Sequence, residues 1–253
     1  MPVKKTTTRK KLTAKRAPSS DASQVSAAIA WLKRHGTERT RAGMARFAIP
    51  SENAVGVSVG DIRVLAKQMG RDHDWVEGLW SSGMYEARML TAFVAEPERL
   101  TSAQMDRLCR DFDNWAICDT LCFHLFDRSP LAWRKVVQWS RKRAEFERRA
   151  AFALLASLAL HDKHAPDAKF LATLPLIEQA APDGRNFVKK AVSWALRGIG
   201  ERSLVLHRAA VKLASELAAS PDAAPRWLGK DVLRQLKSPA VQRRLASRPL
   251  SRK

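Results

Sequence analysis

Helix-breaking residues follow one another at short intervals along almost the whole chain, and the runs between them have the length of helices. Leu, Ala, Val and Phe recur in these runs with the period of amphipathic helices. Only residues 55–59 alternate like a strand, and they are too short and isolated to build a sheet. The breakers are Pro50, Gly56, Gly70, Gly83, Pro97, Pro130, Pro166, Pro182, Gly184, Gly200, Pro221 and Pro239. The sequence therefore predicts an all-α protein.

Helices of similar length with short connectors form either a closed globule or a stack of helical hairpins. A stack leaves one curved face free, which suits an extended rigid ligand. No repeat of fixed period separates the two architectures at this level. We expect residues 1–20 to form a disordered basic arm, residues 21–240 a single domain and residues 241–253 a basic tail. The arm is read equally well as a non-specific phosphate contact or as a solubilising tail. Ser20 or Asp21 is expected to cap the first helix.

The charge of the chain limits its partners. Lys and Arg number 45 against 25 Asp and Glu, which gives a net charge of +20 over 253 residues. Such an excess predicts a polyanionic partner, because neutralising phosphates releases condensed counterions. Nucleic acid is the first candidate and an anionic membrane surface the second. The longest apolar run, residues 150–160, is too short for a bilayer, so no transmembrane helix is expected. Three cysteines make no disulfide framework, so a reducing compartment is expected.

A single carboxylate stands in one of the most apolar stretches. Residues 114–126 contain neither Pro nor Gly and carry one formal charge, that of Asp119. An ionised carboxylate on a helix buried on most sides is costly unless a charged group meets it. Trp115 precedes it by one turn on the same face, and the two could hold a cation. Arg149, in the helix predicted for residues 146–160, can reach Asp119, a phosphate, or both.

A second tryptophan lies off the core face of its helix. In the helix predicted for residues 184–200, the apolar side chains cluster in one arc that does not include Trp194. Trp194 lies instead between Lys190 and Arg197. An aromatic side chain between two cations is what a groove for nucleic acid would use.

A metal site can also be imagined, but the spacing argues against it. Cys118 and Cys122 are four residues apart, and His161 and His164 are three apart. Neither spacing is a standard zinc spacing. Small buried cysteines and solvated histidines are the better interpretation, so we expect no metal and no cofactor.

Taken in order, these residues resemble the AlkD-type alkylpurine DNA glycosylases, the DNA alkylation repair family built from HEAT-like helical repeats. The similarity spans about residues 40–200. The matching pieces are Met44-Ala-Arg-Phe47, Gly56-Val57, Trp115-x-x-x-Asp119, Arg149-Ala-Ala and Lys190-Ala-x-x-Trp194-x-Leu-Arg197. The resemblance implies an α-α superhelix of HEAT-like hairpins, curved into a solenoid with a concave basic groove. Phe47 and Asn114 depart from a well-known member, which has tyrosine and tryptophan there, and this puts the substrate range in doubt.

The resemblance also implies an activity. The family excises positively charged alkylated purines, such as N3-methyladenine and N7-methylguanine, from double-stranded DNA by hydrolysing the N-glycosidic bond without base flipping. Trp115, Asp119 and Trp194 then surround the deoxyribose, and Arg149 supports the aspartate and the DNA backbone. The further DNA contacts expected are Lys190, Arg197, Arg148, Arg46 and Phe47. A monomer acting on the nucleoid in a bacterial cytoplasm is expected.

The chemistry is consistent with these residue types. Alkylation of a ring nitrogen makes a purine a cationic leaving group, so the remaining barrier is the positive charge that develops on the sugar, and a carboxylate stabilises it. No lysine Schiff base, and hence no strand cleavage, is expected. The alternative is a non-catalytic HEAT-like protein that binds bent or branched DNA by shape and phosphate contacts. The set of Trp115, Asp119 and Trp194 discriminates between them, because phosphate binding alone does not require it. A protein scaffold is a weaker third reading, since +20 is an odd surface for one.

Overall fold

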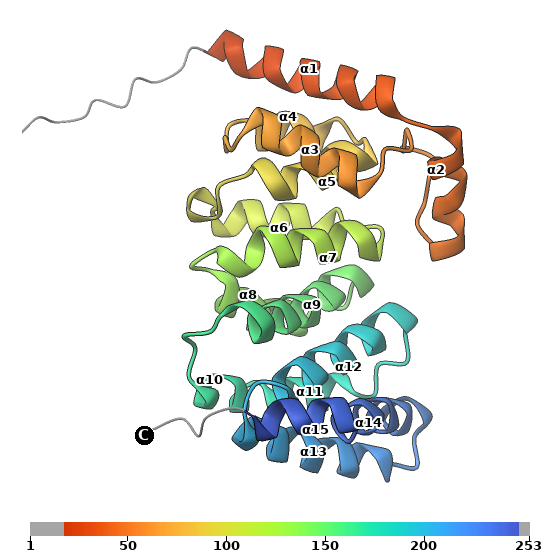
Figure 1. Cartoon of the computed structure of the whole chain (residues 1–253), viewed down its shortest axis with the longest axis vertical. Coiled ribbons are helices and arrows are strands. Elements are labelled where there is room, and N and C mark those ends of the chain that lie inside the picture. The colour runs from red at the N-terminus through yellow and green to blue at the C-terminus, as the bar shows by residue number, and fades with distance from the viewer. Residues whose placement is uncertain (1–17, 248–253) are drawn as a thin grey trace, which may run out of the picture.

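The computed structural model describes residues 18–247, and within them it contains helices and no strand (Figure 1). The α-helices are α1 (Pro18–His35), α2 (Glu38–Gly43), α3 (Val59–Met69), α4 (Trp75–Ser81), α5 (Tyr85–Val94), α6 (Ser102–Arg110), α7 (Trp115–His124), α8 (Ala132–Ser140), α9 (Glu145–His161), α10 (Asp167–Leu171), α11 (Leu174–Ala180), α12 (Asn186–Gly200), α13 (Leu204–Ala218), α14 (Ala223–Leu236) and α15 (Pro239–Ala246). Short 3-10 turns are η1 (Met44–Phe47), η2 (Pro97–Arg99) and η3 (Phe126–Arg128). The all-α prediction is confirmed.

The helices form a two-layered stack rather than a closed globule. Helices α3, α5, α7, α9, α12 and α14 pack against one another in succession and form one layer. Helices α4, α8 and α13 pack behind them, against α5, α9 and α14. Figure 1 shows the stack running the length of the molecule, with α1 at one end and α13 to α15 at the other. One continuous hydrophobic core runs between the layers, so each hairpin is stabilised mainly by its neighbours.

The segment α2–η1 leaves the stack and runs beside it (Figure 1). Its return loop is held by Glu86 of α5, which is fully buried. The Glu86 carboxylate accepts hydrogen bonds from the backbone N–H groups of Val55 (3.1 Å), Gly56 (2.7 Å) and Val57 (3.2 Å). Gly56 has a φ of 85°, and a Cβ there would lie 2.1 Å from the Thr37 carbonyl oxygen. The strand-like alternation of residues 55–59 therefore belongs to a loop wrapped around a buried carboxylate.

The two ends of the domain differ from the sequence prediction. Helix α1 begins at Pro18, ahead of the cap expected at Ser20 or Asp21, and residues 1–17 of the predicted arm lie outside the described residues. Proline suits a first helical turn because an N–H there has no intrahelical partner.

The predicted tail likewise begins inside a helix, because α15 includes residues 241–246. The Ser238 side chain caps α15 by accepting from the Val241 N–H, with Pro239 in the first turn, and Val241 and Leu245 are buried. Ordinary capping and an i,i+4 apolar pair thus extend the fold. Across residues 18–247, no helix has the length and hydropathy needed to span a bilayer.

Candidate active site and nucleic-acid interface

An arginine–carboxylate pair joins three successive helices of the first layer. Arg149 of α9 donates from Nε to Asp119 Oδ1 (2.9 Å) and from Nη2 to Asp119 Oδ2 (2.6 Å), so both carboxylate oxygens of this α7 residue are engaged. Its Nη1 donates to the Phe187 carbonyl oxygen of α12 (2.8 Å). The Arg149 side chain is 7% exposed and that of Asp119 17%. The guanidinium therefore holds both Asp119 oxygens, while the Asp119 side chain stays partly exposed.

Burial is the largest influence on Asp119, and it raises the pKa of the carboxyl above its usual value. The charge and the hydrogen bonds of Arg149 act in the opposite direction and offset part of that shift. A side-chain hydrogen bond from Cys118 acts in the same direction as Arg149. A poorly hydrated carboxylate gains more from a nearby cation than a solvated one does.

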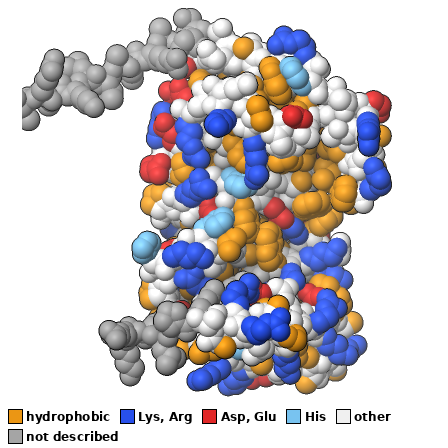
Figure 2. All heavy atoms as spheres, viewed as in Figure 1, with side chains coloured by type: hydrophobic (Ala, Val, Ile, Leu, Met, Phe, Trp, Pro, Cys, Tyr) orange, Lys and Arg blue, Asp and Glu red, His pale blue; other side chains and the backbone are white. Residues whose placement is uncertain are grey.

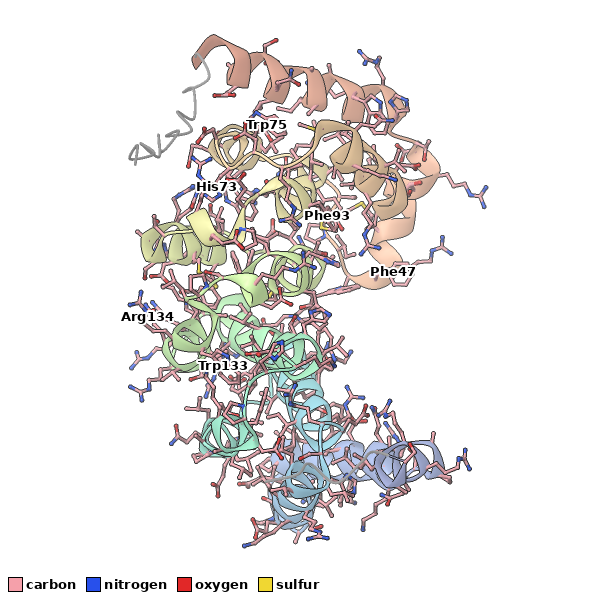
Figure 3. The ribbon with its side chains drawn as sticks, turned by 60° about the vertical axis from the view of Figure 1, so that its left-hand side comes forward. Phe47, His73, Trp75, Phe93, Trp133 and Arg134 are labelled. Carbon is pink, nitrogen blue, oxygen red and sulfur yellow. The ribbon has the colours of Figure 1, made fainter. Side chains whose placement is uncertain are left out.

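Trp115 of α7 is hydrogen-bonded to Phe47 of the α2–η1 segment. The Trp115 indole N–H donates to the Phe47 carbonyl oxygen (2.8 Å). Phe47 is 62% exposed, and Ala48 after it has a left-handed φ of 54°, which is unusual for a residue other than glycine. Figure 3 shows Phe47 at the end of this segment. Asn114, buried, caps α7 by accepting from the Ile117 N–H (3.0 Å).

Trp194 meets α7 through a residue that the sequence analysis missed. The rings of Trp194 and Phe123 are stacked, with centroids 4.7 Å apart and planes 8° apart. Trp115, Asp119 and Phe123 follow at intervals of four and so lie along one face of α7. Asp119 is thus flanked on its own helix by Trp115 and Phe123, and the Phe123 ring stacks on Trp194. The same i,i+4 spacing that paired Trp115 with Asp119 could have identified Phe123.

A cavity of about 400 Å³ opens beside this line of residues, on the side of α12 and α14. Its walls include Arg149, Lys190, Trp194 and Arg197, which the sequence analysis had grouped, and also Trp227 and Asp231 of α14. The Trp227 side chain is 37% exposed, with the Lys189 ammonium 4.9 Å from its ring centroid. The sequence analysis did not include this helix in the site, because nothing local to α14 shows which face meets Trp194.

The other side chains predicted to contact DNA differ in whether a partner within the protein already binds them. Lys190 and Arg46 are exposed. Arg197 donates to the Gln235 side-chain oxygen (2.8 Å), a neutral partner. Arg148 is ion-paired with Asp183 (3.0 Å), which offsets its charge. Cys118 and Cys122 are buried, and within residues 18–247 no three His, Cys, Asp or Glu side chains gather where they could hold a metal ion.

Aromatic and basic side chains continue this surface toward α3. The Arg63 guanidinium lies 5.3 Å from the Phe93 ring centroid, and that ring lies 5.0 Å from the ring of His124. Figure 3 shows Phe93 and Phe47 away from Arg134, which projects at the opposite edge of the molecule. In Figure 2 hydrophobic side chains gather at mid-height, with Lys and Arg side chains above and below them. Basic side chains thus lie around a partly hydrophobic surface, an arrangement that nucleic-acid interfaces also use.

Comparison with known proteins identifies the family and the fold. Residues 28–236 match the family model described as DNA alkylation repair enzyme. A solved structure described as "A new family of proteins related to the HEAT-like repeat DNA glycosylases with affinity for branched DNA structures" is similar in fold, with a TM-score of 0.69 and 19% identity. The match covers 84% of this chain and 95% of that one. No curated protein matches the sequence. The HEAT-like solenoid is therefore confirmed.

Proposed function

Because the chain belongs to the DNA alkylation repair enzyme family, we propose that it is a monofunctional DNA glycosylase. Its substrate is double-stranded DNA that carries positively charged alkylpurines such as N3-methyladenine and N7-methylguanine. It hydrolyses the N-glycosidic bond and leaves an abasic site without turning the base into a pocket. The observation that carries this proposal is the fork of Arg149 on a partly open Asp119 carboxylate (2.9 and 2.6 Å).

The reaction needs little acid catalysis. The alkylated base is already a cation, so it leaves as a neutral purine when the pair of electrons in the C1′–N bond moves onto its ring nitrogen. The deoxyribose is left with oxocarbenium character, water adds to C1′, and a proton is lost to the solvent. The barrier therefore depends on stabilising positive charge on the sugar, and a preorganised carboxylate does this at no cost of reorganisation.

Each residue of the site has a role in this scheme. Asp119 stabilises the sugar cation and orients the attacking water. Trp115 and Trp194 form the walls, and each indole face adds up to about 2 kcal/mol when the cation is desolvated. Arg149 is a positioning residue, because its forked contact fixes both Asp119 oxygens. Lys190, Arg197 and Arg46 contact phosphates, and Phe47 lies against the duplex. Arg148 contributes less charge, because Asp183 neutralises it.

The direct test is release of free methylpurine from methylated duplex DNA under single-turnover conditions. Wild type is expected to release it, and Asp119→Asn to release it at least about tenfold more slowly, because the neutral amide cannot stabilise the sugar cation. Asp183→Asn is the matched control, since Asp183 also accepts an arginine fork (2.9 and 2.6 Å) but has no hydrogen bond to Asp119 or Arg149. Saturating protein keeps any change in DNA affinity through Arg148, the other partner of Asp183, out of the measured rate. Equal release by wild type and Asp119→Asn would remove Asp119 from the mechanism. Thermal unfolding of each variant checks that it is folded.

The second candidate is a non-catalytic protein that recognises bent or branched DNA. The solved structure with 19% identity is described as having affinity for branched DNA structures, and the exposed aromatic and basic surface suits either activity. This alternative predicts no methylpurine release by any variant, together with tight binding to branched DNA. It does not explain why a buried arginine fixes a carboxylate at the interface, since a carboxylate repels phosphates.

A further inference from the structure

A second cavity is larger than the one beside Arg149. It has a volume of about 500 Å³, meets the first cavity at Trp194 and Arg197, and is bordered by α7, α9, α12, α14 and α15. Small side chains line it where α9 and α12 pack closely, since Gly198 there lies against Ala159 and Ala156. Its volume is in the range of small-ligand sites. Trp194 and Arg197 border both cavities, whereas Asp119 and Trp115 are not among the residues that line this one.

The wall of this cavity is aromatic and apolar. The stacked rings of Phe123 and Trp194 form part of it, and neither ring is fully buried. Leu160 of α9 adds an aliphatic side chain that is 53% exposed. Covering apolar surface of this kind with another flat apolar group is favourable, because both surfaces are removed from water. A nucleobase is such a group, because every base has a π-face that stacks on aromatic side chains.

The rim of the same cavity is cationic. Lys163, Arg197, Arg202 and Arg244 line it, and Glu201 is the one carboxylate among the described residues that does. Arg244 forms an ion pair with that carboxylate. Arg202 already donates to the carbonyl oxygens of Ala159 (2.8 Å) and Ala165 (3.2 Å), whereas Lys163 is exposed. The charge of the rim is positive on balance, which favours an anionic ligand. An aromatic wall with a cationic rim therefore fits a ligand with a flat base at one end and a phosphate at the other.

We propose that this cavity binds one unpaired nucleotide of the bound DNA, with its base against Phe123, Trp194 and Leu160 and its phosphate at the rim. A base inside a duplex is covered on both faces by its neighbours, so only a nucleotide outside the stack reaches such a wall. The inference rests on DNA being the ligand of this surface, as in the proposed function. The surface then binds two nucleotides. One has its sugar at Asp119, and the other lies outside the duplex stack with its base in this cavity.

The test compares three DNA duplexes of one sequence that contain no alkylated base. One is fully paired, one has a single bulged nucleotide, and one has the same bulge without its base. The abasic bulge keeps the bend of the bulged duplex but offers nothing to stack. Fluorescence anisotropy gives the dissociation constant for each. Wild type is expected to bind the bulge that has a base at least about fivefold tighter than the abasic bulge.

Leu160→Glu places a carboxylate in the wall and is expected to abolish that difference. Val205→Glu is its matched control, because Val205 is 55% exposed on α13, outside both cavities, and it should keep the difference. Lys163→Glu is expected to weaken binding to both bulges more than to the paired duplex. Both positions are exposed, so these variants should fold, and thermal melting checks it.

Equal affinity of wild type for the two bulges would overturn the inference, as would a difference that persists in Leu160→Glu. Either result leaves the glycosylase proposal standing if methylpurine is still released. A base-dependent difference without methylpurine release would instead overturn the glycosylase alone.

Discussion

Two arginine–aspartate forks with the same bond lengths lie in different surroundings. Arg149 holds Asp119 with bonds of 2.9 and 2.6 Å, and Arg185 holds Asp183 with bonds of 2.9 and 2.6 Å. In the first fork the arginine side chain is 7% exposed and the carboxylate 17%. In the second the arginine is 37% exposed and the carboxylate 7%.

The two carboxyl groups respond in opposite directions. Hydrogen bonds from Arg185 are the largest influence on Asp183 and lower its pKa, helped by the Arg185 backbone N–H and by the charge of Arg148. Burial is the largest influence on Asp119 and raises its pKa despite Arg149. Two forks of the same geometry thus leave their carboxyl groups with pKa shifts in opposite directions. Asp183 is saturated with donors and holds the loop before α12, whereas Asp119 keeps capacity for a further cation.

The largest difference between the forks is expected when each arginine is replaced by lysine. Lysine keeps the charge but cannot make two parallel hydrogen bonds. In Arg149→Lys, Asp119 loses its fixed orientation, and methylpurine release is expected to slow about tenfold, or about 1.4 kcal/mol in activation free energy. Arg185→Lys, which changes an equivalent fork, should leave the release rate unchanged. Equal slowing in both variants would mean that the forks act only through stability.

The pH profile of release separates positioning from general stability. Release requires the Asp119 carboxylate, so the rate falls as pH falls through the pKa of that group in the folded protein. Since burial raises this pKa, the acid limb is expected above the pH at which an ordinary aspartate titrates. Weakening the contact with Arg149 removes an influence that lowers the pKa, so Arg149→Lys should move the limb to still higher pH. The limb of Arg185→Lys should coincide with that of wild type.

The sequence predicted that Asp119 needs a cationic partner, because a lone carboxylate in an apolar helix is costly and that evidence is local. It left Arg149 open as a partner of Asp119, of a phosphate, or of both, and the structure shows the pair with Asp119. The helical periodicity likewise predicted the succession of helices. What the sequence did not reveal was how one helix face lies against the next. The stack of Trp194 on Phe123, and the position of Trp227 in the cavity wall, depend on the crossing of α7, α12 and α14.

The role of Glu86 was also hidden in the sequence. It lies in the first turn of an ordinary amphipathic helix, and its partners are backbone N–H groups about thirty residues earlier in the chain. Every residue except proline has a backbone N–H, so the residue types do not reveal which N–H groups bind Glu86. Residues 55–59 were predicted not to build a sheet despite their alternation. Residues 55–58 lie in the loop that these tertiary hydrogen bonds hold, and Val59 begins α3.

A smaller effect is expected from the carboxylate of the second fork. Asp183→Asn removes the ion pairs with Arg185 and Arg148, and it should lower the free energy of unfolding by about 1 kcal/mol at pH 7, because the exposed Arg185 is screened by solvent. The folded-state pKa of Asp183 is lowered, so its contribution is present above the unfolded pKa and is lost as pH falls through the folded one. Urea unfolding of variant and wild type should therefore converge in acid. A gap that is independent of pH would contradict an electrostatic origin.

The smallest effect is expected at the other end of the Asp119 face, where Trp115 meets Phe47. Trp115→Phe keeps an aromatic wall but removes the N–H that donates to the Phe47 carbonyl oxygen (2.8 Å). That bond is partly solvated, so its loss should cost only about 0.5 kcal/mol of stability. The α2–η1 segment then loses this bond to α7, and affinity for paired duplex should fall about twofold. The single-turnover rate at saturating protein should fall less than in Arg149→Lys, about threefold, because a phenyl face stabilises the sugar cation less than an indole face does. Anisotropy and single-turnover release measured on the same preparation separate the two quantities. If release slowed as much as in Arg149→Lys, the tether to Phe47 would position the site as strongly as the arginine fork, and the contrast between the two forks would no longer explain why Asp119 is reactive.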